Sequence, residues 1–227
     1  MSTFQNSSLA DRAYTQVRRK ILFQELRAGD SVNEQSLARQ LNLGRTPIRE
    51  GVLRLAREGL LRIIPRKGII VTEMNIDTLR LVFEARSPCE VQIARLAALR
   101  SEPSDIKVMK QALAGVEQMI EERRFLDLLR ADERFHMSLA DAARNQLLQE
   151  MQRTLYGLGI RFWYATLPQR SPGDLKKEMK LHRDVIEGIK LRDPDKTAQA
   201  MTAIIAGFPE RVANLIRGQH LQGREQA

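Results

Sequence analysis

Apolar residues at the start of the chain recur with the period of an amphipathic helix. The stretch from Leu9 to Leu26 keeps this spacing and predicts a first helix. Two shorter helices are predicted over Glu34–Leu41 and Arg45–Glu58. The turn between them contains Asn42, which tolerates left-handed backbone angles, and Gly44, which suits a helix N-cap. We therefore expect three helices, with a tight turn before the third.

The pattern changes after this third helix. Two short runs, Leu61–Ile64 and Ile69–Thr72, are rich in β-branched residues and flank the turn sequence Pro65–Gly68. This arrangement predicts a β-hairpin that carries two cations at its tip. Helices, a tight turn, a further helix and a basic hairpin, in that order, are typical of a winged helix-turn-helix domain.

Beyond Thr72 the chain shows only helical periodicity. A linker over Glu73–Asp77 leads into a long helix over Asp77–Arg100, which Pro88 is expected to kink. Further helices are predicted over residues 104–122, 125–143, 146–166, 174–191 and 194–217. The expected fold is mainly α: a winged helix-turn-helix over residues 1–74 with a small hairpin wing, then an all-α antiparallel bundle over residues 77–220.

The composition narrows the class of protein. The 227 residues include 37 Lys and Arg against 28 Asp and Glu, a net charge of +9. Residues 1–74 hold 13 basic and 7 acidic side chains, so the excess is concentrated there. This asymmetry indicates a nucleic-acid-binding module, although on charge alone an ordinary basic domain explains it equally well.

Several classes of protein are excluded. One cysteine, Cys89, leaves no intrachain disulfide and no cysteine-based zinc cluster. No apolar run approaches the ~20 residues of a membrane span, so no membrane partner is expected. The polar start, Ser2–Ser8, lacks the apolar core of a signal peptide. We expect a soluble, cytoplasmic protein.

The front of the third helix carries candidate DNA-binding residues. Arg45 and Arg49 are one turn apart and share a face of the helix. A guanidinium can pair with guanine O6 and N7, and such a pair contributes about 1–3 kcal/mol to discrimination against other bases. Thr46 offers a hydroxyl to phosphate and a methyl group to thymine. The opposite face, with Val52, Leu53, Leu55 and Ala56, is expected to be buried. The alternative is that both arginines are surface charges on a helix packed elsewhere.

The hairpin tip supplies the second group of candidates. Arg66 and Lys67 can lie along the DNA backbone or in the minor groove, and Gly68 permits close approach. The alternative is that they are turn residues without a binding role.

These residues carry a resemblance to a known family. The run from Ser36 to Leu61, with the hairpin tip that follows, is similar to the winged-helix signature of GntR-family bacterial transcription regulators. The sequence departs from the family pattern at Gly44, where Ser or Thr is usual and a hydroxyl contact to phosphate is lost. It also departs at Asn42, where glycine is usual, and at Gln35, where some relatives have arginine.

A second resemblance covers most of the remaining chain. The runs that begin at Phe83, Asp132, Asn145 and His182 resemble the FCD effector domain of the FadR-type subfamily. The resemblance implies that an Asp and three His hold a divalent metal, which helps to bind a small carboxylate.

Three of these ligand positions carry over to this chain, as Asp132, His136 and His182. Two imidazoles and a carboxylate suit Zn, Ni, Mn or Fe. The fourth slot holds Ile204, and His220 lies too far along the chain to fill it. The set is therefore incomplete. The alternative is that the two histidines are hydrogen-bonded residues in a pocket without metal.

Arg86 matches a family position that reaches an effector carboxylate, and a guanidinium suits that pairing. The alternative is a structural salt bridge with Glu90, one turn away.

The combined pattern predicts a DNA-binding transcription regulator. By the resemblance it is a homodimer on a pseudo-palindromic operator, and a small organic acid modulates its affinity for double-stranded DNA. A regulator whose sensing pocket has lost its metal or its effector is the alternative. An enzyme is disfavoured, because the chain shows no nucleophile–base pair, phosphate loop or dinucleotide fingerprint, although two His and one carboxylate also occur in non-haem iron oxygenases.

Overall fold

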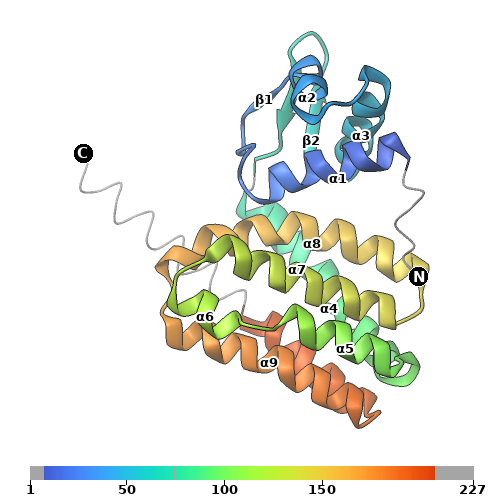
Figure 1. Cartoon of the computed structure of the whole chain (residues 1–227), viewed down its shortest axis with the longest axis vertical. Coiled ribbons are helices and arrows are strands. Elements are labelled where there is room, and N and C mark those ends of the chain that lie inside the picture. The colour runs from blue at the N-terminus through green and yellow to red at the C-terminus, as the bar shows by residue number, and fades with distance from the viewer. Residues whose placement is uncertain (1–7, 74, 208–227) are drawn as a thin grey trace. The chain divides into compact units, whose positions relative to one another are not determined.

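The computed structural model describes residues 8–73 and 75–207 (Figure 1). The chain divides into two compact units, with the boundary between Asn75 and Ile76.

The first unit combines three helices with a small sheet. Its elements in chain order are α1 (Leu9–Leu22), β1 (Ser31–Val32), α2 (Glu34–Leu41), α3 (Arg45–Arg57), β2 (Leu61–Ile64) and β3 (Gly68–Val71). The strands are antiparallel in the order β1-β3-β2, with Leu61 opposite Val71 and Ser31 opposite Ile70. This order confirms the winged helix-turn-helix. Strand β1 was not expected, because two residues are too few to show an alternating pattern.

Local chemistry explains where these helices begin and end. Asn33 caps α2 by accepting a hydrogen bond from the Ser36 backbone N–H at 2.9 Å. Asn42 ends α2 in the left-handed region with φ 50°, as expected, and Gly44 is the N-cap of α3. Helix α1 ends at Leu22 rather than near Leu26, because the chain turns at Gln24, which also has a positive φ of 60°.

The core of the first unit lies between α1 and α3. Ala13 and Val17 of α1 are fully buried, as are Ile48 and Val52 of α3. Gly51 lies at the contact: a Cβ atom there would be 2.8 Å from the Tyr14 backbone nitrogen. Glycine therefore lets the two helices approach closely.

The second unit is all-helical within the described residues, which confirms the predicted bundle. Its elements are α4 (Ile76–Arg100), α5 (Pro103–Ala112), α6 (Val116–Glu121), α7 (Phe125–Ala142), α8 (Gln146–Thr166), a 3-10 turn (Leu167–Gln169), α9 (Pro172–Lys190) and a last helix that begins at residue 194 and is described to residue 207.

The stretch predicted as one helix over residues 104–122 is two helices in the structure. That prediction is wrong because Gly115, whose φ is 74°, interrupts the helix and separates α5 from α6. The rest of the helix predicted to residue 217, and His220, lie outside the described residues.

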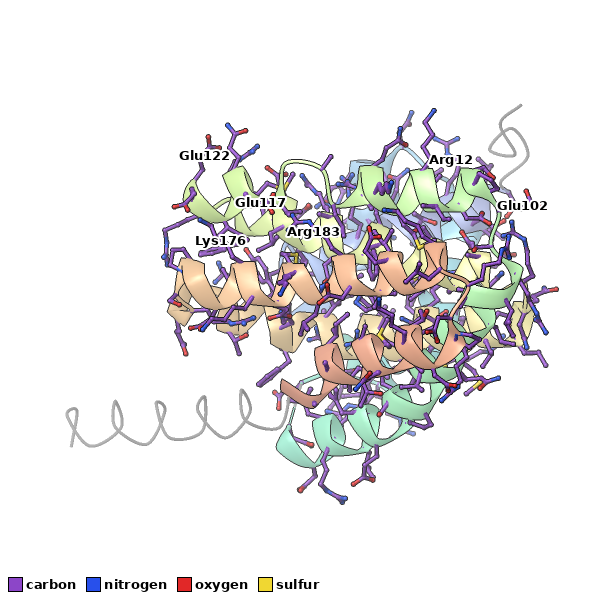
Figure 2. All side chains as sticks on the ribbon, turned by 90° about the horizontal axis from the view of Figure 1, so that it is seen from below. Arg12, Glu102, Glu117, Glu122, Lys176 and Arg183 are labelled. Atoms are coloured by element: carbon purple, nitrogen blue, oxygen red, sulfur yellow. The ribbon has the colours of Figure 1, made fainter. Side chains whose placement is uncertain are left out.

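Ion pairs and buried side chains hold the helices of this unit together. Arg183 of α9 pairs with Glu117 of α6, and Lys176 of α9 extends toward the same helix (Figure 2).

Within the described residues, no helix combines the length and apolar character needed to cross a bilayer.

Candidate functional site

One face of α3 presents the predicted reading residues together. Arg45, Thr46 and Arg49 are exposed and line a single hollow. The hollow is completed by Glu50 and Leu53 of α3 and by Glu34 of α2. Among the described residues, no carboxylate lies within ion-pair distance of Arg45 or Arg49. Both guanidiniums are therefore available to an external acceptor.

The prediction for the opposite face of α3 is wrong at Leu53. Val52 and Leu55 are fully buried and Ala56 is partly buried, whereas Leu53 is 40% exposed and lies in the hollow. At about 100° per residue, Leu53 falls about 20° from Thr46 around the helix, so it shares the exposed face.

Another arginine of α3, Arg54, contacts side chains of α1. The Arg54 guanidinium lies 3.9 Å from the centre of the Tyr14 ring, and its Nη1 atom is 3.3 Å from Asp11 Oδ1. This side chain stabilises the contact between α1 and α3 and leaves the hollow to Arg45 and Arg49.

The tip of the hairpin exposes its two cations. The Lys67 backbone N–H donates to the Ile64 carbonyl at 3.1 Å and closes the turn. Arg66 has a φ of 64°, a region that non-glycine residues rarely adopt. Gly68 has a φ of 100°, and no atom lies within 4 Å of the position a Cβ would take. Arg66, Lys67 and Gly68 are all exposed.

A second cluster lies inside the helical unit. Asp132 and His136 of α7 and His182 of α9 are buried, with potential ligand atoms within 4.8 Å of one another. His182 Nε2 lies 3.0 Å from Asp132 Oδ1, and His136 Nε2 lies 3.8 Å from the same oxygen.

Neighbouring groups orient both imidazoles. His182 Nδ1 is 2.9 Å from the Glu178 carbonyl oxygen, which can only accept, so this nitrogen carries the proton. His136 Nδ1 is 3.1 Å from Glu90 Oε2. The Nε2 atoms of both rings are thereby turned toward Asp132, an orientation typical of metal-ligating histidines.

Asp132 is held in the same manner. The Tyr156 hydroxyl donates a hydrogen bond to Oδ2 at 2.6 Å, so Oδ1 is the oxygen that faces the two imidazoles. Among the described residues, His182 Nε2 finds no partner in hydrogen-bond geometry although Oδ1 is 3.0 Å away. A lone pair facing a carboxylate at this distance requires a cation, either a proton or a metal ion, between the two atoms.

The charges of the cluster are strongly perturbed. Burial raises the pKa of Asp132, but the neighbouring imidazoles of His136 and His182 outweigh it and hold this pKa well below its usual range. Burial likewise opposes ionisation of Glu90, but Arg86 and His136 lower its pKa to about 2. Both carboxylates are therefore anionic at neutral pH.

The donors fit a divalent metal. Two imidazole nitrogens and one carboxylate oxygen converge, and Zn, Ni, Mn and Fe accept such ligands. Hydrogen bonds hold His182 Nδ1 and Asp132 Oδ2, whereas His136 Nδ1 lies at ion-pair distance from Glu90 without hydrogen-bond geometry. Two of the three donor residues, Asp132 and His136, line a pocket together with Phe83, Arg86, Ile160, Trp163, Glu178, Ile204 and Ile205. Ile204 therefore lies at the same pocket as these two residues, and its side chain offers no donor.

Arg86 occupies the wall of this pocket and forms the salt bridge with Glu90. Burial lowers the pKa of Arg86, but Glu90 outweighs burial and the pKa is raised. A Cβ atom at Gly159 would be 3.1 Å from Arg86 Nη1, so glycine at this position makes room for the guanidinium.

Several residues of the cluster could not be identified from the sequence. Tyr156, Gln152 and Trp163 come from α8, beyond the family-like run at its start, and their hydroxyl, amide and indole groups donate hydrogen bonds to Asp132, Glu90 and Glu178. The spacing of Arg86 and Glu90 suggested their ion pair as the alternative to effector binding, but it did not predict the approach of Glu90 to a histidine of another helix.

Comparisons with known proteins identify the family of each unit. Residues 9–71 match the model described as "Bacterial regulatory proteins, gntR family", and residues 81–207 match the FCD domain. The chain is 27% identical over 202 residues to the HTH-type transcriptional repressor RspR of Escherichia coli K12, covering 89% of this chain and 88% of that protein. It is 29% identical over 192 residues to the Nta operon transcriptional regulator of Aminobacter aminovorans, covering 85% and 89%.

Solved structures share the fold. Escherichia coli McbR/YncC superimposes with a TM-score of 0.81 at 19% identity, covering 94% of this chain and all of that one. A GntR regulator from Rhodococcus sp. RHA1 gives 0.71 at 15% identity, covering 92% and 98%. These family models and relatives are transcriptional regulators rather than enzymes. The chain belongs to the GntR family of bacterial regulatory proteins, in the group with an FCD domain, and is a DNA-binding transcription regulator.

Proposed function

We propose that residues 1–74 read an operator through α3 and the hairpin tip, and that residues 77–220 bind a small carboxylate that changes operator affinity. The observation that carries the first part is the exposed group Arg45, Thr46 and Arg49 on one face of α3, with both guanidiniums unpaired among the described residues.

The chemistry of this face suits the major groove of DNA. Arg45 and Arg49 present guanidinium forks to guanine O6 and N7, and Thr46 presents a hydroxyl to phosphate. Arg66 and Lys67 at the hairpin tip lie along the backbone or in the minor groove, where Gly68 allows close approach. Two such heads in a homodimer recognise a pseudo-palindromic operator.

The second part is supported by the polar end of the FCD pocket. Asp132, His136 and His182 would hold a divalent metal, and the metal would supply a Lewis-acidic position for an effector carboxylate. The Arg86 guanidinium, already at the pocket wall, would pair with the same anion. Binding alters operator affinity only as far as the effector prefers one of two states of the dimer.

The fluorescence of a tryptophan in this pocket can report ligand binding. Trp163 is the one tryptophan in the sequence, and it lines the pocket. Small organic acids titrated with and without Zn²⁺ or Ni²⁺ should change its fluorescence, and Arg86→Gln should abolish the response to the acids. Metal-dependent quenching without any response to acids would contradict effector binding.

A regulator with a degenerate pocket is the second candidate, and Ile204 is the observation that favours it. Ile204→His would add an imidazole to the three donors, so it should bind Zn²⁺ at least tenfold more tightly than the natural chain. Titration calorimetry measures this difference. An unchanged affinity would contradict the assignment of residue 204 to the ligand slot.

A further inference from the structure

We propose that Leu53 reads a thymine: its side chain packs on the thymine C5-methyl group and makes the third turn of α3 a specificity-determining element. This inference rests on the proposed entry of α3 into the major groove. It concerns a position that sequence reasoning assigned to the buried face.

The first argument is the direction of the side chain. Leu53 is 40% exposed, whereas Val52 before it and Leu55 two residues after it are fully buried. On the helix it falls about 20° from Thr46 and about 40° from Arg49, and about 6 Å further along the axis than Arg49. The leucine thus continues the stripe of side chains that faces DNA in the proposed complex.

The second argument is its surroundings. Leu53 lines the same hollow as Arg45, Thr46 and Arg49, so DNA that engages the arginines also covers the leucine. Base edges in the major groove present hydrogen-bonding groups at every pair and one apolar group, the thymine methyl. An apolar side chain that is desolvated on this surface therefore has one favourable contact.

The third argument is the charge next to Leu53. Glu50 of α3, one turn before Leu53, and Glu34 of α2 line the same hollow. Two carboxylates repel phosphate oxygens, so the hollow favours base edges over the DNA backbone. Leu9, another exposed leucine of the same unit at 55% exposure, does not line the hollow.

The test removes a single methyl group from DNA. Duplexes bound by the full-length protein are selected from a random library, and each thymine of the resulting site is replaced in turn by deoxyuridine, which retains pairing and the O4 acceptor. For the natural protein, one thymine per half-site should show about fourfold weaker binding on replacement, the equivalent of one buried methyl group.

Leu53→Ala should bring this ratio close to one at that thymine while it leaves the effect of Arg49→Ala in place. The matched control is Leu9→Ala, which should retain the fourfold ratio. A natural protein that is indifferent to every thymine methyl, or a ratio that survives Leu53→Ala, would overturn the inference. Failure to select any sequence would instead contradict the proposed reading by α3.

Discussion

At Gly51, an alanine substitution is expected to change helix propensity and helix packing in opposite directions. In an isolated helix, Gly51→Ala would stabilise α3 by about 1 kcal/mol, because glycine loses more backbone entropy on folding. In the folded unit, the new Cβ would lie 2.8 Å from the Tyr14 nitrogen and 3.1 Å from the Ala13 carbonyl carbon. Both atoms belong to the α1 backbone, so no side chain can rotate to relieve the overlap.

The magnitude follows from these two effects. Carbon atoms in favourable contact lie about 3.5–4.0 Å apart, so α1 must move away from α3 by several tenths of an ångström. Inserting one such group into a packed core costs about 1–3 kcal/mol, and the gain in propensity offsets part of it. We expect Gly51→Ala to lower the free energy of unfolding of the first unit by about 1–2 kcal/mol.

Hydrogen exchange read by mass spectrometry at increasing urea concentration tests this prediction, because peptides from α1 and α3 report the first unit separately from the helical bundle. The control is Glu50→Ala, which changes the adjacent exposed residue and should stay within about 0.5 kcal/mol of the natural protein. Amides of α1 and α3 that are equally or better protected in Gly51→Ala would refute the packing argument.

Two further predictions concern the buried cluster. Tyr156→Phe removes the hydroxyl that orients Asp132. The affinity for Zn²⁺ or Ni²⁺ measured by calorimetry should therefore fall about 10–100-fold. An unchanged affinity would show that this contact does not position the ligand. Arg86 and His136 hold the pKa of Glu90 at about 2, below its ordinary value of 4.5, so its contribution to stability is present above that ordinary value and is lost as pH falls toward 2. In metal-free buffer, the free energy of unfolding should therefore fall between pH 6 and 3 by about 2 kcal/mol more in the natural protein than in Glu90→Gln; parallel pH profiles would contradict this assignment.

The sequence predicted the elements better than the faces they bury. Asn42 and Gly44 predict the turn before α3 because few residue types suit those backbone angles. The structure confirms the left-handed angles of Asn42 and the N-cap position of Gly44. Leu53 shows the limit of periodicity: Val52, Leu53, Leu55 and Ala56 form an apolar band, and the elements packed on α3, mainly α1, decide which edge of it is covered.

The candidate metal site shows a similar division. A family motif predicted Asp132, His136 and His182, and the side chains of α7 and α9 converge inside the bundle as this motif requires. The groups that orient them could not be predicted, because Glu90 and Tyr156 lie far from them in sequence and carry no local signature.

The account depends most on the reading of DNA by the front of α3. Equilibrium binding to a duplex selected from a random library, compared with binding to an unselected duplex, measures this directly. Arg49→Ala should reduce the preference for the selected duplex by about 1–3 kcal/mol, roughly 5–150-fold. Arg12→Ala removes the same charge from an exposed position on α1 and should weaken both duplexes alike. Equal losses of preference in the two variants would contradict the central claim.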